Sequence, residues 1–135
     1  MNLGISQRAG DAPWAVLVRL PIKVESEANK REHWRKVNKR KQEQREATHM
    51  AVAAAFKKTP LQAPLIVTLT RIGPRKLDSD NVVGGFKFVR DGVAKAVGID
   101  DGDRARIGWN YAQRTSSPKA EIRYGIEILI EERRS

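Results

Sequence analysis

Alternating apolar and polar residues predict two strands in the first half of the chain, with a long helix between them. The run from Ala15 to Leu20 alternates, and Pro21 marks the exit from this strand. From about residue 32 to residue 58 the pattern is helical, with a basic first half and an alanine-rich second half. Residues 65–72 are predicted to form the second strand, and a basic turn follows it.

The second half of the chain predicts one more helix and two further strands. Between residue 80 or 81 and residue 97, apolar residues recur at steps of three and four, and Gly98 supplies a stop signal. This stripe consists of Val82, Phe86, Val89, Val93 and Val97. The next strand is expected to carry Ile107, Trp109 and Tyr111 on one face, and the last strand Ile122, Tyr124, Ile126, Ile128 and Ile130. The order β-α-β-α-β-β predicts an α+β fold, with two helices packed on a small mixed sheet.

Length and composition favour one globular domain. The chain has 135 residues, of which we expect 1–12 to be a flexible leader and 13–135 a single domain. The leader lacks the pattern of a secretory signal, and no apolar run is long enough to span a membrane. The absence of cysteine excludes disulfides and thiolate sites, which fits a cytoplasmic protein.

The charge is strongly positive and concentrated in one segment. The chain has 26 basic and 16 acidic residues, and residues 30–46 contribute +5 of the net charge of +10. This favours a polyanionic partner, with a solvated helix face as the alternative. Trp34 in this segment is expected to be a packing residue, with a stacking contact to the partner as the other interpretation. The cations expected to bind backbone phosphates of such a partner are Lys30, Arg31, Arg35, Lys36, Lys39, Arg40, Arg45, Arg75 and Lys76.

Six acids lie within 26 residues of this basic chain: Asp78, Asp80, Asp91, Asp100, Asp101 and Asp103. Two carboxylates 4 Å apart repel by roughly 4 kcal/mol at an effective dielectric near 20, so such a cluster either spreads out in water or binds a cation. Helix capping by Ser79 or Asp80, and turn formation around Asp100, are the simpler roles. A calcium loop is excluded because Val83 stands where glycine is required, and the two histidines are badly spaced for zinc. Oxygen donors without sulfur suit Mg²⁺ or Mn²⁺.

The acidic segment resembles the signature of the RusA-like Holliday junction resolvases. That signature is Asp-x-Asp-Asn, a lysine, an aspartate four residues later, and an Asp-Asp pair after a short helix. The resemblance is specific over residues 77–103 and general over 14–131, but about three extra residues separate Asn81 from Lys87 compared with the shortest members. It implies that Asp78, Asp80 and Asp101 hold the metal and that Lys87 is the essential lysine. Asn81, Asp91 and Asp100 fall on supporting positions.

The resemblance further implies a homodimeric, Mg²⁺-dependent endodeoxyribonuclease of DNA recombination and repair. Such an enzyme resolves four-way junctions or related branched DNA by paired nicks. The alternative is a basic nucleic-acid-binding module, or a catalytically inactive relative of the family.

The predicted second helix bears on how the acids meet. A continuous helix from residue 80 to residue 97 spans about 27 Å, which separates Asp78 and Asp80 from Asp101. Two chains related by a two-fold axis would bring Asp101 of one to the acids of the other. Gly84 and Gly85 either allow a partner to approach closely or break the helix so that the chain folds back on itself.

Overall fold

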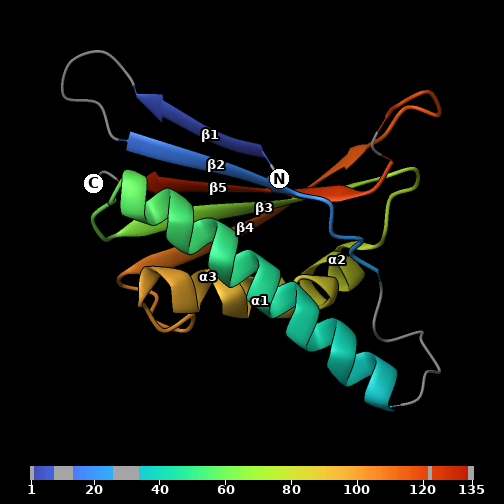
Figure 1. Ribbon diagram of the computed structural model, residues 1–135, viewed down its shortest axis with the longest axis horizontal. Coiled ribbons are helices and arrows are strands. Elements are labelled where there is room, and N and C mark those ends of the chain that lie inside the picture. The colour runs from blue at the N-terminus through green and yellow to red at the C-terminus, as the bar shows by residue number, and fades with distance from the viewer. Residues whose placement is uncertain (1, 8–13, 26–33, 122, 134–135) are drawn as a thin grey trace.

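The chain has an α+β fold, in which helices cover one face of a mixed sheet (Figure 1). The computed structural model describes residues 2–7, 14–25, 34–121 and 123–133. Within these residues, the elements in chain order are β1 (Asn2–Gln7), β2 (Trp14–Leu20), α1 (Trp34–Lys58), β3 (Leu65–Gly73), α2 (Ser79–Gly85), α3 (Lys87–Val97), β4 (Ile107–Thr115) and β5 (Gly125–Glu132).

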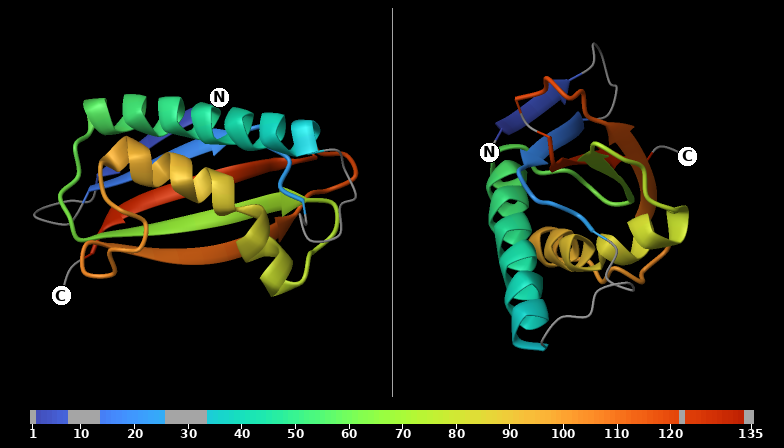
Figure 2. Two further views of the ribbon diagram at one scale, coloured as in Figure 1. Left: turned by 90° about the horizontal axis from the view of Figure 1, so that it is seen from below. Right: turned by 90° about the vertical axis from the view of Figure 1, so that its right-hand side faces the viewer.

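The described strands form one sheet in the order β1-β2-β5-β3-β4. β3 and β4 are parallel, whereas the other neighbouring strands are antiparallel. Burial alternates along β3, as expected for a strand with one face on the core. The sheet therefore turns one face toward the helices and leaves the opposite face without a helix among the described residues (Figure 2).

The core lies between the sheet and the helices. Strand residues such as Val18, Val67 and Ile128 are fully buried. α3 packs closely on α1 at Gly92, where a Cβ would lie only 2.6 Å from the backbone oxygen of Arg45. The buried residues of α1 begin only at Gln44, and the N-terminal end of this helix projects beyond the sheet (Figures 1 and 2).

The four strands predicted from residue 14 onward are present, although Tyr124, expected on the last strand, precedes β5, and the flexible leader is corrected. Residues 2–7 form β1, which pairs antiparallel with β2 along its whole length. The sheet therefore includes residues 2–7 of the segment that was expected to be a leader. Residues 1 and 8–13, and Ile122 of the last predicted strand, lie outside the described residues.

The predicted helix over residues 80–97 is also corrected, because it is broken at Phe86 into α2 and α3 (Figure 2). Phe86 is fully buried, and its ring lies 6.1 Å from that of Tyr111. A Cβ at Gly85 would lie 2.7 Å from the backbone oxygen of Glu25, so this glycine admits the chain's own backbone. Gly98 ends α3 with φ 72°, as its stop signal predicted.

Candidate metal and nucleic-acid site

The turn between β3 and α2 carries the first two acids, and a buried arginine holds it in place. Arg71 is 5% exposed; its Nε donates to the Val24 carbonyl at 3.0 Å and its Nη1 donates to the Arg75 carbonyl at 2.6 Å. Burial lowers the pKa of Arg71, and Tyr124 and Glu25 act against this shift. The turn is therefore fixed from the core side, while the side chains of Arg75 and Lys76 remain exposed.

A glutamine of β4 clamps the same turn from the other side. The backbone N–H of Leu77 donates to Gln113 Oε1, and Gln113 Nε2 donates to the Leu77 carbonyl, both at 2.8 Å. This paired contact places the start of α2 beside position 113 of the sheet. Neither Arg71 nor Gln113 was recognised from the sequence, although an arginine at an inward position of an alternating strand is an available signal.

Asp78 and Asp80 are exposed, and neither side chain makes a hydrogen bond or ion pair with another described residue. The helix-capping role falls on Asp78 rather than on Ser79 or Asp80, yet its side chain makes no capping hydrogen bond. Capping chemistry therefore does not account for these two carboxylates. Asn81 follows them in the first turn of α2 and is half-buried.

Lys87 begins α3 as an exposed side chain with no ion pair in the part of the chain described here. Asp91, four residues further along α3, does not form an ion pair with Lys87. Asp91 instead lies 3.3 Å from Arg45 Nη2, which links α3 to α1. Asp91 and Arg45 thus link α3 to α1, and the predicted phosphate contact of Arg45 stays a prediction.

The loop after α3 carries the second pair of acids, and Arg90 anchors it. Arg90 Nε donates to Asp101 Oδ2 at 3.0 Å, and Nη2 donates to the Asp101 carbonyl at 3.0 Å. Arg90 Nη1 donates to the Tyr111 hydroxyl at 2.9 Å, and its guanidinium lies over the Trp109 ring. Desolvation alone would lower the pKa of Arg90, but the contacts with Tyr111 and Asp101 raise it overall.

The two acids of this loop have different surroundings. Asp100 Oδ1 accepts a hydrogen bond from the Gly102 N–H at 2.9 Å, which is a turn-forming role. Asp101 is 41% exposed at its side chain, and its carbonyl also accepts from Trp109 Nε1 at 2.9 Å. Asp101 is therefore held on β4 beside Trp109, with part of its carboxylate open to solvent.

The acid turn and the Asp101 loop approach the same face of β4. Gln113 holds the turn and Trp109 contacts the loop; four residues at about 3.3 Å each place these positions roughly 13 Å apart. This is about half the separation that a continuous helix would impose. Even so, no three acidic or histidine side chains of the described chain are grouped closely enough to hold a metal ion. A pocket of about 290 Å³ lies between α2 and β4, with Lys76 and Tyr111 in its wall.

The basic helix presents its cations near its free end. Arg35, Lys36 and Lys39 are exposed on α1, and Lys39 lies 3.9 Å from Glu43 in an exposed ion pair. Arg40 is half-buried and has contacts of its own. Lys30 and Arg31 lie outside the described residues.

Trp34 corrects one expectation at this end of α1. It is 62% exposed and is therefore not the packing residue that the helical pattern indicated.

None of the helices in the described part of the chain is both long and apolar enough to cross a membrane.

Comparison with known proteins does not identify a family. No protein-family model and no curated protein matches the chain. Among solved structures, PurLQS from Thermotoga maritima is 13% identical, with a TM-score of 0.40, over 96% of this chain and 19% of that one. The 2C-methyl-D-erythritol 2,4-cyclodiphosphate synthase from Plasmodium vivax is 12% identical, with a TM-score of 0.32, over 64% of this chain and 52% of that one. This chain thus spans only part of either protein.

Proposed function

We propose that this protein is a cytoplasmic, metal-dependent endodeoxyribonuclease that nicks branched DNA, related to the RusA-like resolvases. One observation carries the proposal: among the described residues, Asp78 and Asp80 are exposed and make no side-chain hydrogen bond or ion pair, on a turn that also presents Arg75 and Lys76. Free carboxylates attract a cation and free basic side chains attract a phosphate. A turn that offers both suits hydrolysis of a phosphodiester.

The carboxylates suit Mg²⁺ or Mn²⁺, because both ions prefer oxygen ligands. Asp78, Asp80 and Asp101 would hold the ion, which supplies an activated water and offsets the negative charge of the phosphate. Lys87 is exposed and has no carboxylate partner within the described chain, so its ammonium is available to a phosphate oxygen. Arg90 would keep Asp101 at a fixed place on β4.

The complete acid set is proposed to form across a homodimer. β4 is an edge of the described sheet, and Tyr111 lies midway between Trp109 and Gln113. Antiparallel pairing of two β4 edges around Tyr111 would put Trp109 opposite Gln113 of the partner subunit. The Asp101 loop of one chain would then face the acid turn of the other. This replaces the pairing of two long helices, because α3 packs against α1 in its own chain.

The substrate surface is completed by α1. Its projecting end carries Arg35, Lys36 and Lys39 away from the acids, and their exposed side chains would contact phosphates of a second DNA arm. Two equivalent sites in a two-fold dimer match the two-fold symmetry of a four-way junction. Both features favour branched DNA over a small phosphorylated substrate.

Substituting Asp80→Asn tests the proposal. It is expected to abolish Mg²⁺-dependent nicking of a synthetic four-way junction while leaving junction binding in EDTA unchanged. Asp103→Asn is the matched control, because Asp103 lies outside the predicted metal-binding set. Cleavage by the Asp80→Asn variant at the wild-type rate refutes the assignment.

A non-catalytic nucleic-acid-binding module is the rival function. The ion pair between Asp101 and Arg90 and the turn role of Asp100 favour it, since both give acids of the signature a purely structural use. Calorimetry separates the two functions. Binding of Mn²⁺ that is lost in Asp80→Asn supports the nuclease, whereas wild-type protein that binds neither Mg²⁺ nor Mn²⁺ supports the rival.

A further inference from the structure

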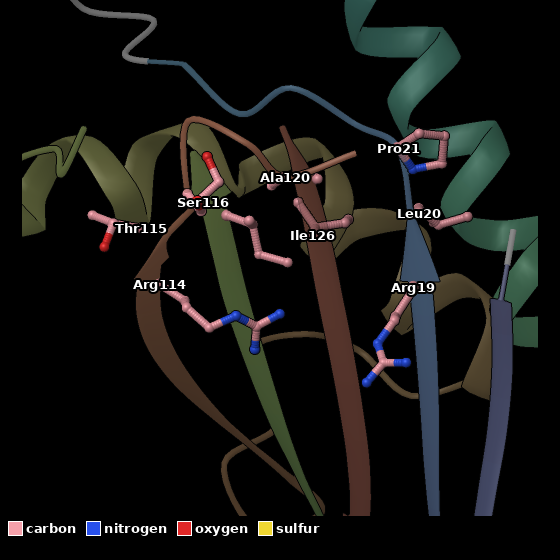
Figure 3. Close-up of a pocket in the computed structure, with 11 residues that line it drawn as sticks. Arg19, Leu20, Pro21, Arg114, Thr115, Ser116, Ala120 and Ile126 are labelled. Atoms are coloured by element: carbon pink, nitrogen blue, oxygen red, sulfur yellow. The ribbon is translucent and has the colours of Figure 1, made fainter. Parts of the chain in front are cut away.

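A pocket of about 380 Å³ lies at the end of the sheet where β3 leads into the acid turn (Figure 3). Its walls include Pro21 after β2, Ile72 of β3 and Ala120 of the loop between β4 and β5. Gly125 lies two residues before Glu127, hence on the same face of β5, and contributes no side chain to fill the space. The pocket is within the usual size range of a small-ligand site.

Two arginines line this pocket and share one buried carboxylate. Arg19 Nε and Arg114 Nη1 each lie 2.6 Å from an oxygen of Glu127, and the two guanidinium groups converge from either side of β5 (Figure 3). Glu127 is 8% exposed, whereas the arginine side chains are 53% and 57% exposed. The cluster therefore has an excess of positive charge on its solvent side, with N–H donors beyond those that Glu127 uses.

The pocket combines apolar walls with a cationic border, which suits a ligand with a flat apolar body and an anionic group. A nucleotide has both parts. The bases of a duplex are stacked and paired and cannot enter a recess of this size, whereas an unpaired base can be turned out of its strand.

We propose that this pocket binds one unpaired nucleotide of single-stranded DNA, with its phosphate on the solvent side of Arg19 and Arg114. The pocket is close to the acid turn, because Ile72 lines it and Asp78 follows six residues later, at most about 20 Å along an extended chain. A strand that leaves a branch point at the acids would therefore reach the pocket within a few nucleotides. The identity of that strand rests on the proposed function, but the anion site does not.

The test measures binding of a fluorescent oligothymidylate in EDTA, so that no cleavage is involved. Glu127→Gln keeps the shape of the side chain and removes the negative charge, so we expect affinity to rise about three- to tenfold. Arg114→Gln is expected to lower affinity by a similar factor and to reduce the salt-dependence slope by about 0.7. The matched control is Arg104→Gln, because Arg104 is exposed and lies outside this pocket. We expect it to change the affinity and the salt-dependence slope by less than Arg114→Gln does.

A purely structural ion cluster gives a different result. In that case Glu127→Gln does not raise the affinity for oligothymidylate, and the inference is overturned even if Arg114→Gln is poorly folded. Equal changes for oligothymidylate and a blunt linear duplex also overturn it, because they indicate general electrostatics and not a site for an unpaired nucleotide. Opposite shifts in the two variants support the pocket, whether or not the protein cleaves junctions.

Discussion

Mixing two inactive variants, Asp80→Asn and Asp101→Asn, is expected to restore DNA cleavage. In one chain the acid turn and the Asp101 loop contact β4 at Gln113 and Trp109, roughly 13 Å apart along the strand. In an antiparallel β4 pair centred on Tyr111, these two positions face one another from adjacent strands about 4.8 Å apart. The second chain thus shortens the separation between the supporting strand positions by more than half.

The expected recovery follows from the symmetry of the dimer. Random exchange of subunits makes half of the dimers mixed, and each mixed dimer has one intact composite site of two, so about a quarter of the wild-type sites return. One intact site makes one nick. The mixture should therefore accumulate singly nicked four-way junctions, whereas wild-type protein yields two nicked duplexes.

The assay follows a labelled four-way junction in Mg²⁺, with each variant alone as the control. If each site is built within one chain, both site types in the mixture lack an acid and cleavage stays at the level of the single variants. That outcome refutes the composite site, provided that subunit exchange is shown separately with differently tagged chains.

Cysteine cross-linking tests the β4 edge directly, because the chain has no cysteine of its own. Pairing centred on Tyr111 puts Asn110 opposite Ala112 of the partner subunit, at a Cβ separation of about 4.5–5.5 Å. A mixture of Asn110→Cys and Ala112→Cys chains should give a disulfide-linked heterodimer under mild oxidation. Lys95→Cys chains, altered on the exposed side of α3, serve as the control. Absence of the heterodimer contradicts this pairing.

Three further predictions concern stability and DNA binding. Gly92→Ala should lower the unfolding free energy by about 1–3 kcal/mol, because the added Cβ would meet the backbone of α1. Gly84 faces open space, so Gly84→Ala should raise the unfolding free energy by up to about 1 kcal/mol. Urea denaturation measures both changes. Burial alone would raise the pKa of Glu127, but hydrogen bonds from Arg114 and Arg19 lower it overall from its ordinary value of 4.5. The ionised Glu127 therefore stabilises the folded protein above pH 4.5, and this stabilisation is lost as the pH falls through the lowered pKa. Acid should therefore destabilise wild-type protein more than Glu127→Gln. The exposed cations near the start of α1 are Arg35, Lys36 and Lys39. Replacing any one of them by alanine should reduce, by about 0.9, the slope of log affinity for duplex DNA against log salt concentration, with Lys57→Ala as the control.

The sequence predicted the fold wherever the signal was local. Strands β2 to β5 and helix α1 follow apolar periodicity, which depends on neighbours within one element. The break at Phe86 was missed because Val82 and Val89 continue the apolar stripe on both sides of it. The Phe86 N–H also keeps a helical hydrogen bond to the Val82 carbonyl, at 3.1 Å, so the break changes the helix direction without shifting the spacing of apolar residues in the sequence. β1 was missed because its pairing with β2 is a tertiary contact.

The candidate site was predictable as a set of acids but not as an arrangement. Asp78 and Asp101 stand out because six aspartates fall within 26 residues of a basic chain. The residues that position them, Arg71, Arg90 and Gln113, make contacts across 11 to 47 positions of sequence. Spacing within a motif has no information about such contacts, which depend on the assembled sheet.

The projecting end of α1 has a consequence for how the molecule avoids inhibiting itself. A small protein rich in both signs of charge tends to satisfy its carboxylates with its own lysines and arginines. Here the cations of α1 begin at Arg35, nine residues before the first buried side chain of that helix, at Gln44, and so stand clear of the acid turn. Under the proposed function, an approaching polyanion would meet a positive arm first, while Asp78 and Asp80 would stay unmasked for a metal ion.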